Sequence, residues 1–215
     1  MKLETRNKMR VHKLTTENKK NRKTNCRKLY ENHLAGKRSE YAVTLDEALV
    51  YIEDSNRERR ICYIRKGERV PESWVMEKDE NFKKGFMIVG VITAWDTVPL
   101  FRVPSQVKIN SQYYIDYVLK PLFTKHLPRL YPNEMNKVFF HHDKASSHTA
   151  FSTTEYLEKL KSSKGISYLE KDDIHVKAPD ASPLDFYGFG YLKQKLSTRR
   201  ARTLDGVWKL SQEVW

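Results

Sequence analysis

The stretch VFFHHDKASSHTA, residues 138–150, decides how the rest of the sequence is interpreted. It begins as an apolar strand, reaches two histidines and Asp143, and continues into a small, hydroxyl-rich segment suited to a helix start. An acid at the tip of a buried strand costs free energy unless a metal ion or a helix start compensates it. The interpretation therefore depends on whether other carboxylates can meet Asp143.

Runs rich in β-branched and aromatic residues predict a sheet around this stretch. Residues 41–53, 59–67 and 86–95 are expected to form an antiparallel meander of three strands, with a protruding loop at 66–85. Helices and strands then alternate, and the expected order is helix 111–127, strand 137–143, helix 146–163, strand 165–171 and helix 182–197. This order predicts an α/β fold with a mixed five-stranded sheet flanked by helices, the layout of the ribonuclease-H-like fold.

Positive charge is concentrated at the N-terminus. The 215 residues carry a formal charge of +13, and residues 1–40 contain 13 Lys and Arg against four acids. We interpret residues 1–40 as a basic arm with an amphipathic helix at about 17–34, residues 41–200 as one domain and residues 201–215 as a tail. The basic excess favours a polyanionic partner such as nucleic acid, with a merely solubilising surface as the alternative.

Apolar spacing predicts which faces of the last helix and tail are buried. Phe186, Phe189, Leu192 and Leu196 recur at helical spacing and are expected to face the core. The following run KQKLSTRRAR (193–202) has five Lys and Arg and no acid. It could follow a DNA backbone, act as a nuclear localisation signal or end a solvated helix, while residues 204–215 either pack back through Trp208 or hang loose.

Several classes of protein are excluded by composition. Cys26 and Cys62 cannot form a disulfide framework, and no CxxC spacing exists for a metal site. The first ten residues lack the apolar region of a secretory signal. The longest apolar stretch, 86–95, is too short for a membrane span, which needs about 20 apolar residues. We expect an intracellular protein with no membrane partner.

Three aspartates have settings that could bring them together. Asp46 lies inside the first strand, Asp143 ends the fourth, and Asp185 lies in the first turn of the last helix. Oxygen ligands of this kind suit Mg²⁺ or Mn²⁺, and two ions about 3.5–4 Å apart can drive phosphodiester chemistry. Each aspartate also has a structural alternative: an exposed edge strand for Asp46, a helix cap for Asp143, and an ordinary helix start for Asp185.

The histidines raise zinc as an alternative metal. His141 and His142 are adjacent on a strand and so point to opposite faces, which makes joint ligation of one ion difficult. Packing roles, or support of carboxylate ligands by His148, fit the sequence better.

Four motifs, in this order, resemble the catalytic domain of mariner-type DNA transposases: VTLDEA, GFMIVGVITAWDTVPL, HHDKASSHTA and PDASPLDFYGFGYLK. The resemblance covers residues 10–200 and assigns Asp46, Asp143 and Asp185 to the family's three catalytic, metal-binding aspartates. There are 96 residues between the first two and 41 between the last two, and the second interval is longer than in typical mariner elements.

The resemblance implies a ribonuclease-H-like fold and cut-and-paste transposition dependent on two Mg²⁺ or Mn²⁺ ions. Its implied partners are double-stranded DNA, as transposon ends and target, and a second copy of the chain on that DNA, held in part by a clamp-like loop at 66–85. The implied location is the nucleus. A ribonuclease-H-type nuclease with other substrates would share the chemistry.

The sequence departs from the family in two ways. Lys144 replaces the family's asparagine beside Asp143, where it could contact phosphate or oppose metal binding. The helix-turn-helix modules that precede this domain in the family have no counterpart, so the chain is expected to be a catalytic fragment or a catalytically inactive, DNA-binding or dimerising remnant of a decayed transposon.

Overall fold

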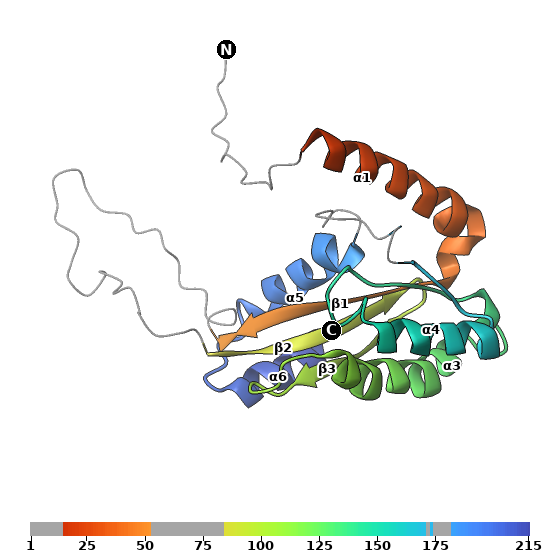
Figure 1. Ribbon diagram of the computed structural model, residues 1–215. Coiled ribbons are helices and arrows are strands. Elements are labelled where there is room, and N and C mark those ends of the chain that lie inside the picture. Colours follow the sequence, from red (N-terminus) through yellow and green to blue (C-terminus); the bar gives the residue numbers. More distant parts are fainter. Residues whose placement is uncertain (1–14, 53–83, 171–172, 174–181) are drawn as a thin grey trace, which may run out of the picture.

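A five-stranded mixed sheet forms the centre of the protein in a computed structural model, which describes residues 15–52, 84–170, 173 and 182–215 (Figure 1). The strands lie in the order β3-β2-β1-β4-β5. Their bounds are β1 Ala42–Tyr51, β2 Gly85–Thr93, β3 Thr97–Val103, β4 Phe139–His141 and β5 Ser167–Tyr168. The β1–β2 and β2–β3 pairs are antiparallel, whereas the β1–β4 and β4–β5 pairs are parallel. The predicted mixed sheet is confirmed.

Helices surround this sheet. The α-helices are α1 Thr16–Leu29, α2 Ser111–Tyr113, α3 Leu127–Leu130, α4 Phe151–Lys164, α5 Phe189–Leu196 and α6 Leu204–Val214. π-Helical turns occupy Tyr30–Leu34, Tyr114–Leu119, Leu122–His126 and Leu184–Gly188, and 3₁₀ turns occupy Gly36–Tyr41 and Met135–Lys137. The predicted helix at 17–34 is thus present as α1 and its π-helical turn.

Both faces of the sheet are covered by apolar packing. The larger core joins β1, β2 and β4 to the helical segment 111–130 and to α4, with Val43, Leu45 and Phe140 fully buried. The smaller core lies on the opposite face, where α5 and α6 pack against Val50 and Ile88 (Figure 1). Strand β1 is therefore central, with a packed layer on each side.

The C-terminal segment is part of the smaller core. Val207 in α6 is fully buried, and the Trp208 ring meets Phe86 edge to face. The Trp215 indole donates a hydrogen bond to the carbonyl of Val98 at 2.8 Å. Of the two expected arrangements for the tail, the structure has the packed one.

The predicted meander is wrong in its strand membership. Strand β1 pairs directly with β2, and the third antiparallel strand is β3. Pro99 disguises β3 in the sequence, because proline is tolerated only where a ladder hydrogen bond is not needed, as on this edge strand. Residues 59–67 and most of the expected loop at 66–85 fall outside the described part of the chain.

Helix length also bears on membrane association. Among the described residues, no helix has the length and apolar character needed to cross a bilayer.

Candidate metal centre

Asp46 occupies the middle of β1 and faces the α5 side of the sheet. Asp46 is only 8% exposed, which excludes the exposed edge strand considered as an alternative. The residue opposite Asp46 on the neighbouring strand β2 is Gly90, where an added Cβ would lie 3.0 Å from the Phe189 ring and 3.1 Å from the Trp215 ring. Glycine at position 90 therefore lets the helix that follows Asp185 approach the strand that carries Asp46.

Asp143 follows β4 by two residues and reaches the level of Asp46. In the parallel β1–β4 pair, Thr44 lies opposite His141, so two further residues along each chain bring Asp46 and Asp143 to matching positions. The Oδ1 atom of Asp143 accepts the backbone N–H of Ala145 at 3.0 Å, which fixes the turn before α4. The side chain of Asp143 is 54% exposed and so accessible to a ligand.

Asp185 comes from the π-helical turn that precedes α5. Ser182 links it to the strand, because its Oγ accepts the Asp185 N–H at 3.4 Å and donates to Asp46 Oδ2 at 3.2 Å. Leu184 next to it is fully buried and anchors the turn, whereas Asp185 itself is exposed. The predicted helix start at Ser182 is therefore present, and it also orients the Asp46 carboxylate.

The three aspartates share one electrostatic environment. Burial, followed by the negative charge of Asp185, raises the pKa of Asp46 to about 7. Burial and the charge of Asp143 raise the pKa of Asp185. Within the described residues, neither Asp46 nor Asp185 has an ion-pair partner. This part of the site therefore gathers negative charge that the described protein residues do not balance.

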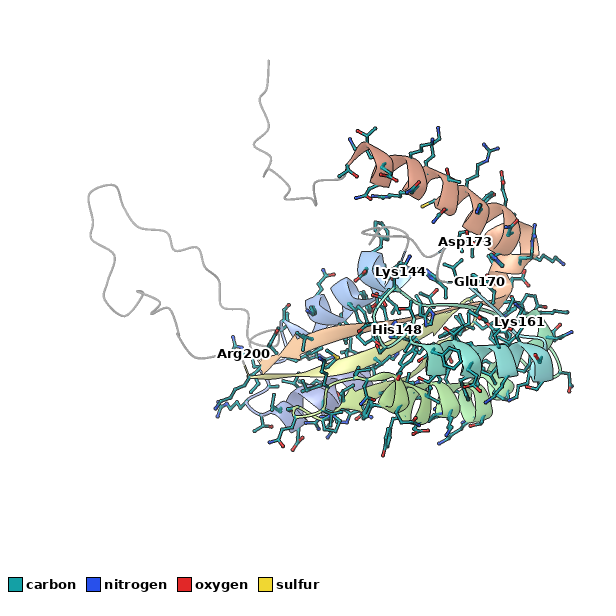
Figure 2. All side chains as sticks on the ribbon, viewed as in Figure 1. Lys144, His148, Lys161, Glu170, Asp173 and Arg200 are labelled. Atoms are coloured by element: carbon teal, nitrogen blue, oxygen red, sulfur yellow. The ribbon has the colours of Figure 1, made fainter. Side chains whose placement is uncertain are left out.

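Glu47 faces the opposite side of β1 and belongs to a second group that the sequence reasoning missed. His148, whose side chain is fully buried, contacts Glu47 Oε1 through Nε2 at 2.9 Å and Asp143 Oδ1 through Nδ1 at 2.7 Å. Burial alone would lower the pKa of His148, but these two carboxylates outweigh it and raise the pKa to about 9. His148, labelled in Figure 2, is thus an imidazolium, and it contacts two acids.

His148 in turn stabilises the charge of Asp143. Burial alone would raise the pKa of Asp143, but the hydrogen bond and charge of His148 give a net lowering. Single ligand atoms of Glu47, Asp143 and His148 lie within 4.8 Å of one another, so this group could itself approach a metal ion. However, both ring nitrogens of His148 already contact the carboxylates of Glu47 and Asp143, which favours a positioning role for His148.

His142 fills the space behind His148 and does not join a metal site. Its ring stacks on His148 with centroids 5.0 Å apart, and its Nδ1 lies 3.1 Å from the Tyr114 hydroxyl. Burial lowers the pKa of His142 well below its usual range, so it is neutral. His142 thus takes the packing role expected for it and does not support the zinc alternative.

The donor set fits a hard divalent cation. Asp46, Asp143 and Asp185 offer carboxylate oxygens, the ligands that Mg²⁺ and Mn²⁺ prefer. Burial and then repulsion from neighbouring carboxylates raise the pKa of Asp46, and a cation would offset both by favouring its charged form. The three aspartates could therefore hold a divalent ion between β1, the end of β4 and the helix start at Leu184.

Several solved structures share this fold. The Mos1 mariner paired-end complex with Mn is 22% identical with a TM-score of 0.80, over 99% of this chain and 59% of that one. The Mos1 paired-end complex with the left transposon end is 22% identical with a TM-score of 0.79, over 99% of this chain and 58% of that one. The catalytic domain of Mos1 mariner transposase is 20% identical with a TM-score of 0.65, over 95% of this chain and 84% of that one. The fold is that of the Mos1 catalytic domain.

This likeness confirms the ribonuclease-H-like fold expected from the order of elements. No protein-family model matches the sequence, and no curated protein matches it either. The chain spans somewhat under two thirds of the Mos1 chains in the paired-end complexes.

Proposed function

We propose that this chain is the catalytic domain of a mariner-type transposase, which cleaves and joins DNA with the help of divalent metal ions. The proposal rests chiefly on one observation: Asp46, Asp143 and Asp185 come from three different elements, yet the charges of Asp143 and Asp185 raise the pKa of Asp46, and that of Asp143 raises the pKa of Asp185. A fold similar to the Mos1 catalytic domain supports the same assignment.

The three aspartates would hold one or two Mg²⁺ or Mn²⁺ ions. Such an ion lowers the pKa of bound water and offsets the charge that develops on phosphate oxygens. Ser182 orients Asp46, while the Ala145 N–H and His148 fix Oδ1 of Asp143. No hydrogen bond within the described residues reaches Oδ2 of Asp143, so that oxygen remains available to a ligand.

The proposed reaction has two stages without a covalent enzyme intermediate. Water first attacks a phosphodiester phosphorus at the transposon end, forming a new P–O bond and releasing a 3′-hydroxyl. That hydroxyl then attacks a phosphorus of target DNA, and the target strand's own 3′-oxygen leaves. One phosphodiester is exchanged for another in this second stage.

The expected partners follow from the same proposal. Solved Mos1 structures are described as complexes with transposon ends, and by analogy this chain would act as a homodimer on paired ends. The 13 Lys and Arg of residues 1–40 supply phosphate contacts that do not depend on base sequence. Action on chromosomal DNA would place the protein in the nucleus.

The inactive-remnant alternative has no structural observation in its favour. All three aspartates are present, and their surroundings are intact in the described residues. A nuclease of the ribonuclease-H type would use the same three aspartates on another nucleic acid. The nucleic acid that the protein cleaves therefore distinguishes the two functions.

The test is nicking of supercoiled plasmid with Mn²⁺ or Mg²⁺, with an RNA–DNA hybrid as the competing substrate. Wild type is compared with Asp143→Asn and Asp185→Asn, which keep shape and remove a ligand charge. Asp116→Asn is the matched control. Asp116 pairs with Lys120, four residues further along the same helical segment, which carries none of the three site aspartates. We expect metal-dependent nicking that falls more than about 100-fold in the two site variants only. Equal activity of all variants, or cleavage of the hybrid alone, contradicts the proposal.

A further inference from the structure

Three aromatic side chains next to Asp185 lie on the outside of the protein. Phe186 is 75% exposed, Tyr187 63% and Tyr191 40%. The sequence pattern placed Phe186 in the core, and this prediction is wrong: the buried position is Leu184. The turn at 184–188 is π-helical, and its extra residue rotates Phe186 out of phase with α5.

These side chains form an ordered surface. Tyr187 and Tyr191 are one turn apart, and their rings stack with centroids 5.7 Å apart and an interplanar angle of 21°. One turn further, the Lys195 ammonium lies 5.3 Å from the centre of the Tyr191 ring. We call Phe186, Tyr187, Tyr191 and Lys195 the aromatic strip. From position 186 to 195 it extends roughly 14 Å along the helix axis.

The helix leaves room beside these rings. Gly190 is exposed, and an added Cβ there would meet no atom within 4 Å. Glycine inside a helix costs about 1 kcal/mol relative to alanine. Space beside Phe186 and Tyr191 is therefore kept open at a position where packing would allow a better helix former.

Positive charge continues from the aromatic strip. Residues 186–204 contain five basic side chains and no acid, and the basic ones are Lys193, Lys195, Arg199, Arg200 and Arg202. In the part of the chain that the structure describes, no carboxylate pairs with Lys195 or with the three arginines. Figure 2 shows Arg200 at the far end of α5 from Lys144 and His148, so basic charge extends from the candidate site along the helix.

We propose that the aromatic strip binds unpaired nucleotides of the DNA strand that the metal centre cleaves. This proposal rests on the proposed function. Exposed rings offer faces on which bases stack, and neighbouring cations hold the phosphates between those bases. The strip begins at the residue after Asp185, so a strand lying on it enters the cleavage site directly. Duplex DNA keeps its base faces covered, and only unpaired bases can use these rings.

A second copy of the chain is a poorer occupant for the same surface. In a two-fold dimer the same patch meets itself, which would oppose the basic run of one copy with that of the other. Like charges face to face disfavour such an interface. A polyanion with flat apolar groups complements both properties of the strip.

The test measures binding of a fluorescein-labelled oligothymidylate of about 15 nucleotides, by anisotropy in EDTA. Tyr187→Ala is compared with Tyr117→Ala, its matched control: both tyrosines are 63% exposed, and each stacks on a tyrosine four residues away. Loss of one stacked base predicts at least about fivefold weaker binding for Tyr187→Ala. Tyr117→Ala and Tyr187→Phe should stay within about twofold of wild type. Lys195→Gln should reduce the salt slope by about 0.7.

Each contrary result has a definite meaning. Equal binding by Tyr187→Ala and wild type, or an equal loss in Tyr117→Ala, overturns the strip as a nucleotide site. A change in sedimentation mass for Tyr187→Ala with unchanged binding assigns the surface to protein contact and also overturns it. Because the assay contains no metal, wild type that binds the oligonucleotide but does not nick plasmid contradicts the proposed function alone.

Discussion

Asp46 and Glu47 are neighbours in one strand, yet the two faces of β1 treat them in opposite ways. Asp46 lies near other carboxylates, no cationic side chain of the described residues pairs with it, and its pKa rises to about 7. On the far face, the partly buried Glu47 carboxylate meets the buried imidazolium of His148 at 2.9 Å. The α5 face is thus electrostatically incomplete, whereas the α4 face is complete. Asp143 touches both, and the contrast suggests that one face binds an ion while the other holds its ligand in place.

Substitution of Asp46 should give the largest effect and separate activity from stability. Asp46→Asn removes a proposed metal ligand, so DNA nicking should fall by more than about 100-fold. The same change removes a buried, repelled charge, so the metal-free protein at pH 8 should melt at a higher temperature than wild type. Plasmid nicking and thermal melting in EDTA check the two parts. A lower melting temperature would mean that Asp46 is stabilised by a partner on the α5 face.

Substitution of His148 should have the reverse signature. His148→Gln leaves Glu47 and Asp143 without their shared cation, and breaking such a pair destabilises the fold. We expect about 2 kcal/mol in denaturant unfolding, below the 3–5 kcal/mol of fully buried pairs, since Asp143 is half exposed. His126→Gln is the control, as His126 packs against Phe101 instead of a carboxylate. Equal losses of stability in both variants would show that the contacts of His148 with Glu47 and Asp143 do not stabilise the fold.

The pH dependence of stability should divide between the two faces. The pKa of Asp46 in the folded protein, about 7, exceeds the ordinary value of 3.8. The stability that its protonated form contributes is therefore fully present below about pH 4 and is lost as pH rises through 7. Protonated His148 contributes stability that is fully present below about pH 6.5 and is lost as pH rises through about 9. Melting temperatures in EDTA from pH 5 to 9 should therefore fall in two steps.

Two comparisons assign those steps. Asp46→Asn should remove the fall that ends near pH 7 and keep the one near pH 9, and Mn²⁺ should offset the first step in wild type. An unchanged first step in Asp46→Asn would show that another group titrates there.

Lys144 lies next to Asp143, where the two faces meet, and should give the smallest effect. It is exposed, and within the described residues no acid pairs with it. Lys144→Asn, the residue of the resembling family, should lower the salt slope of duplex DNA binding by about 0.9 and change Mn²⁺ affinity less than twofold. Tighter Mn²⁺ binding in the variant would instead mean that the lysine opposes the ion.

The sequence predicted what depends on local pattern and missed what depends on pairing. Asp46, Asp143 and Asp185 were singled out because each lies at a recognisable strand or helix position, and their role as a metal site stays a prediction. Glu47 was not singled out, because only the register of β1 beside β4, with α4 behind them, shows that it meets His148. Alternation along β1 does carry a signal, since residues 46 and 47 must face opposite sides.

Two further misses have similar causes. Strand β3 escaped notice because Pro99 suggests a break, and edge position became evident only from the sheet order. Phe186 was assigned to the core on a period of 3.6 residues, which the π-helical turn at 184–188 does not keep. In both cases a local rule was overridden by tertiary arrangement.

Calorimetric titration of Mn²⁺ at pH 8 tests the central claim most directly, with wild type beside Asp46→Asn and Glu47→Gln. If the ion lies among the three aspartates, Asp46→Asn should weaken binding by more than about 100-fold, while Glu47→Gln, which touches the ligand Asp143 only through His148, should weaken it by about tenfold or less. The opposite order, with binding kept in Asp46→Asn and lost in Glu47→Gln, would place the ion in the Glu47–Asp143–His148 group and contradict the account.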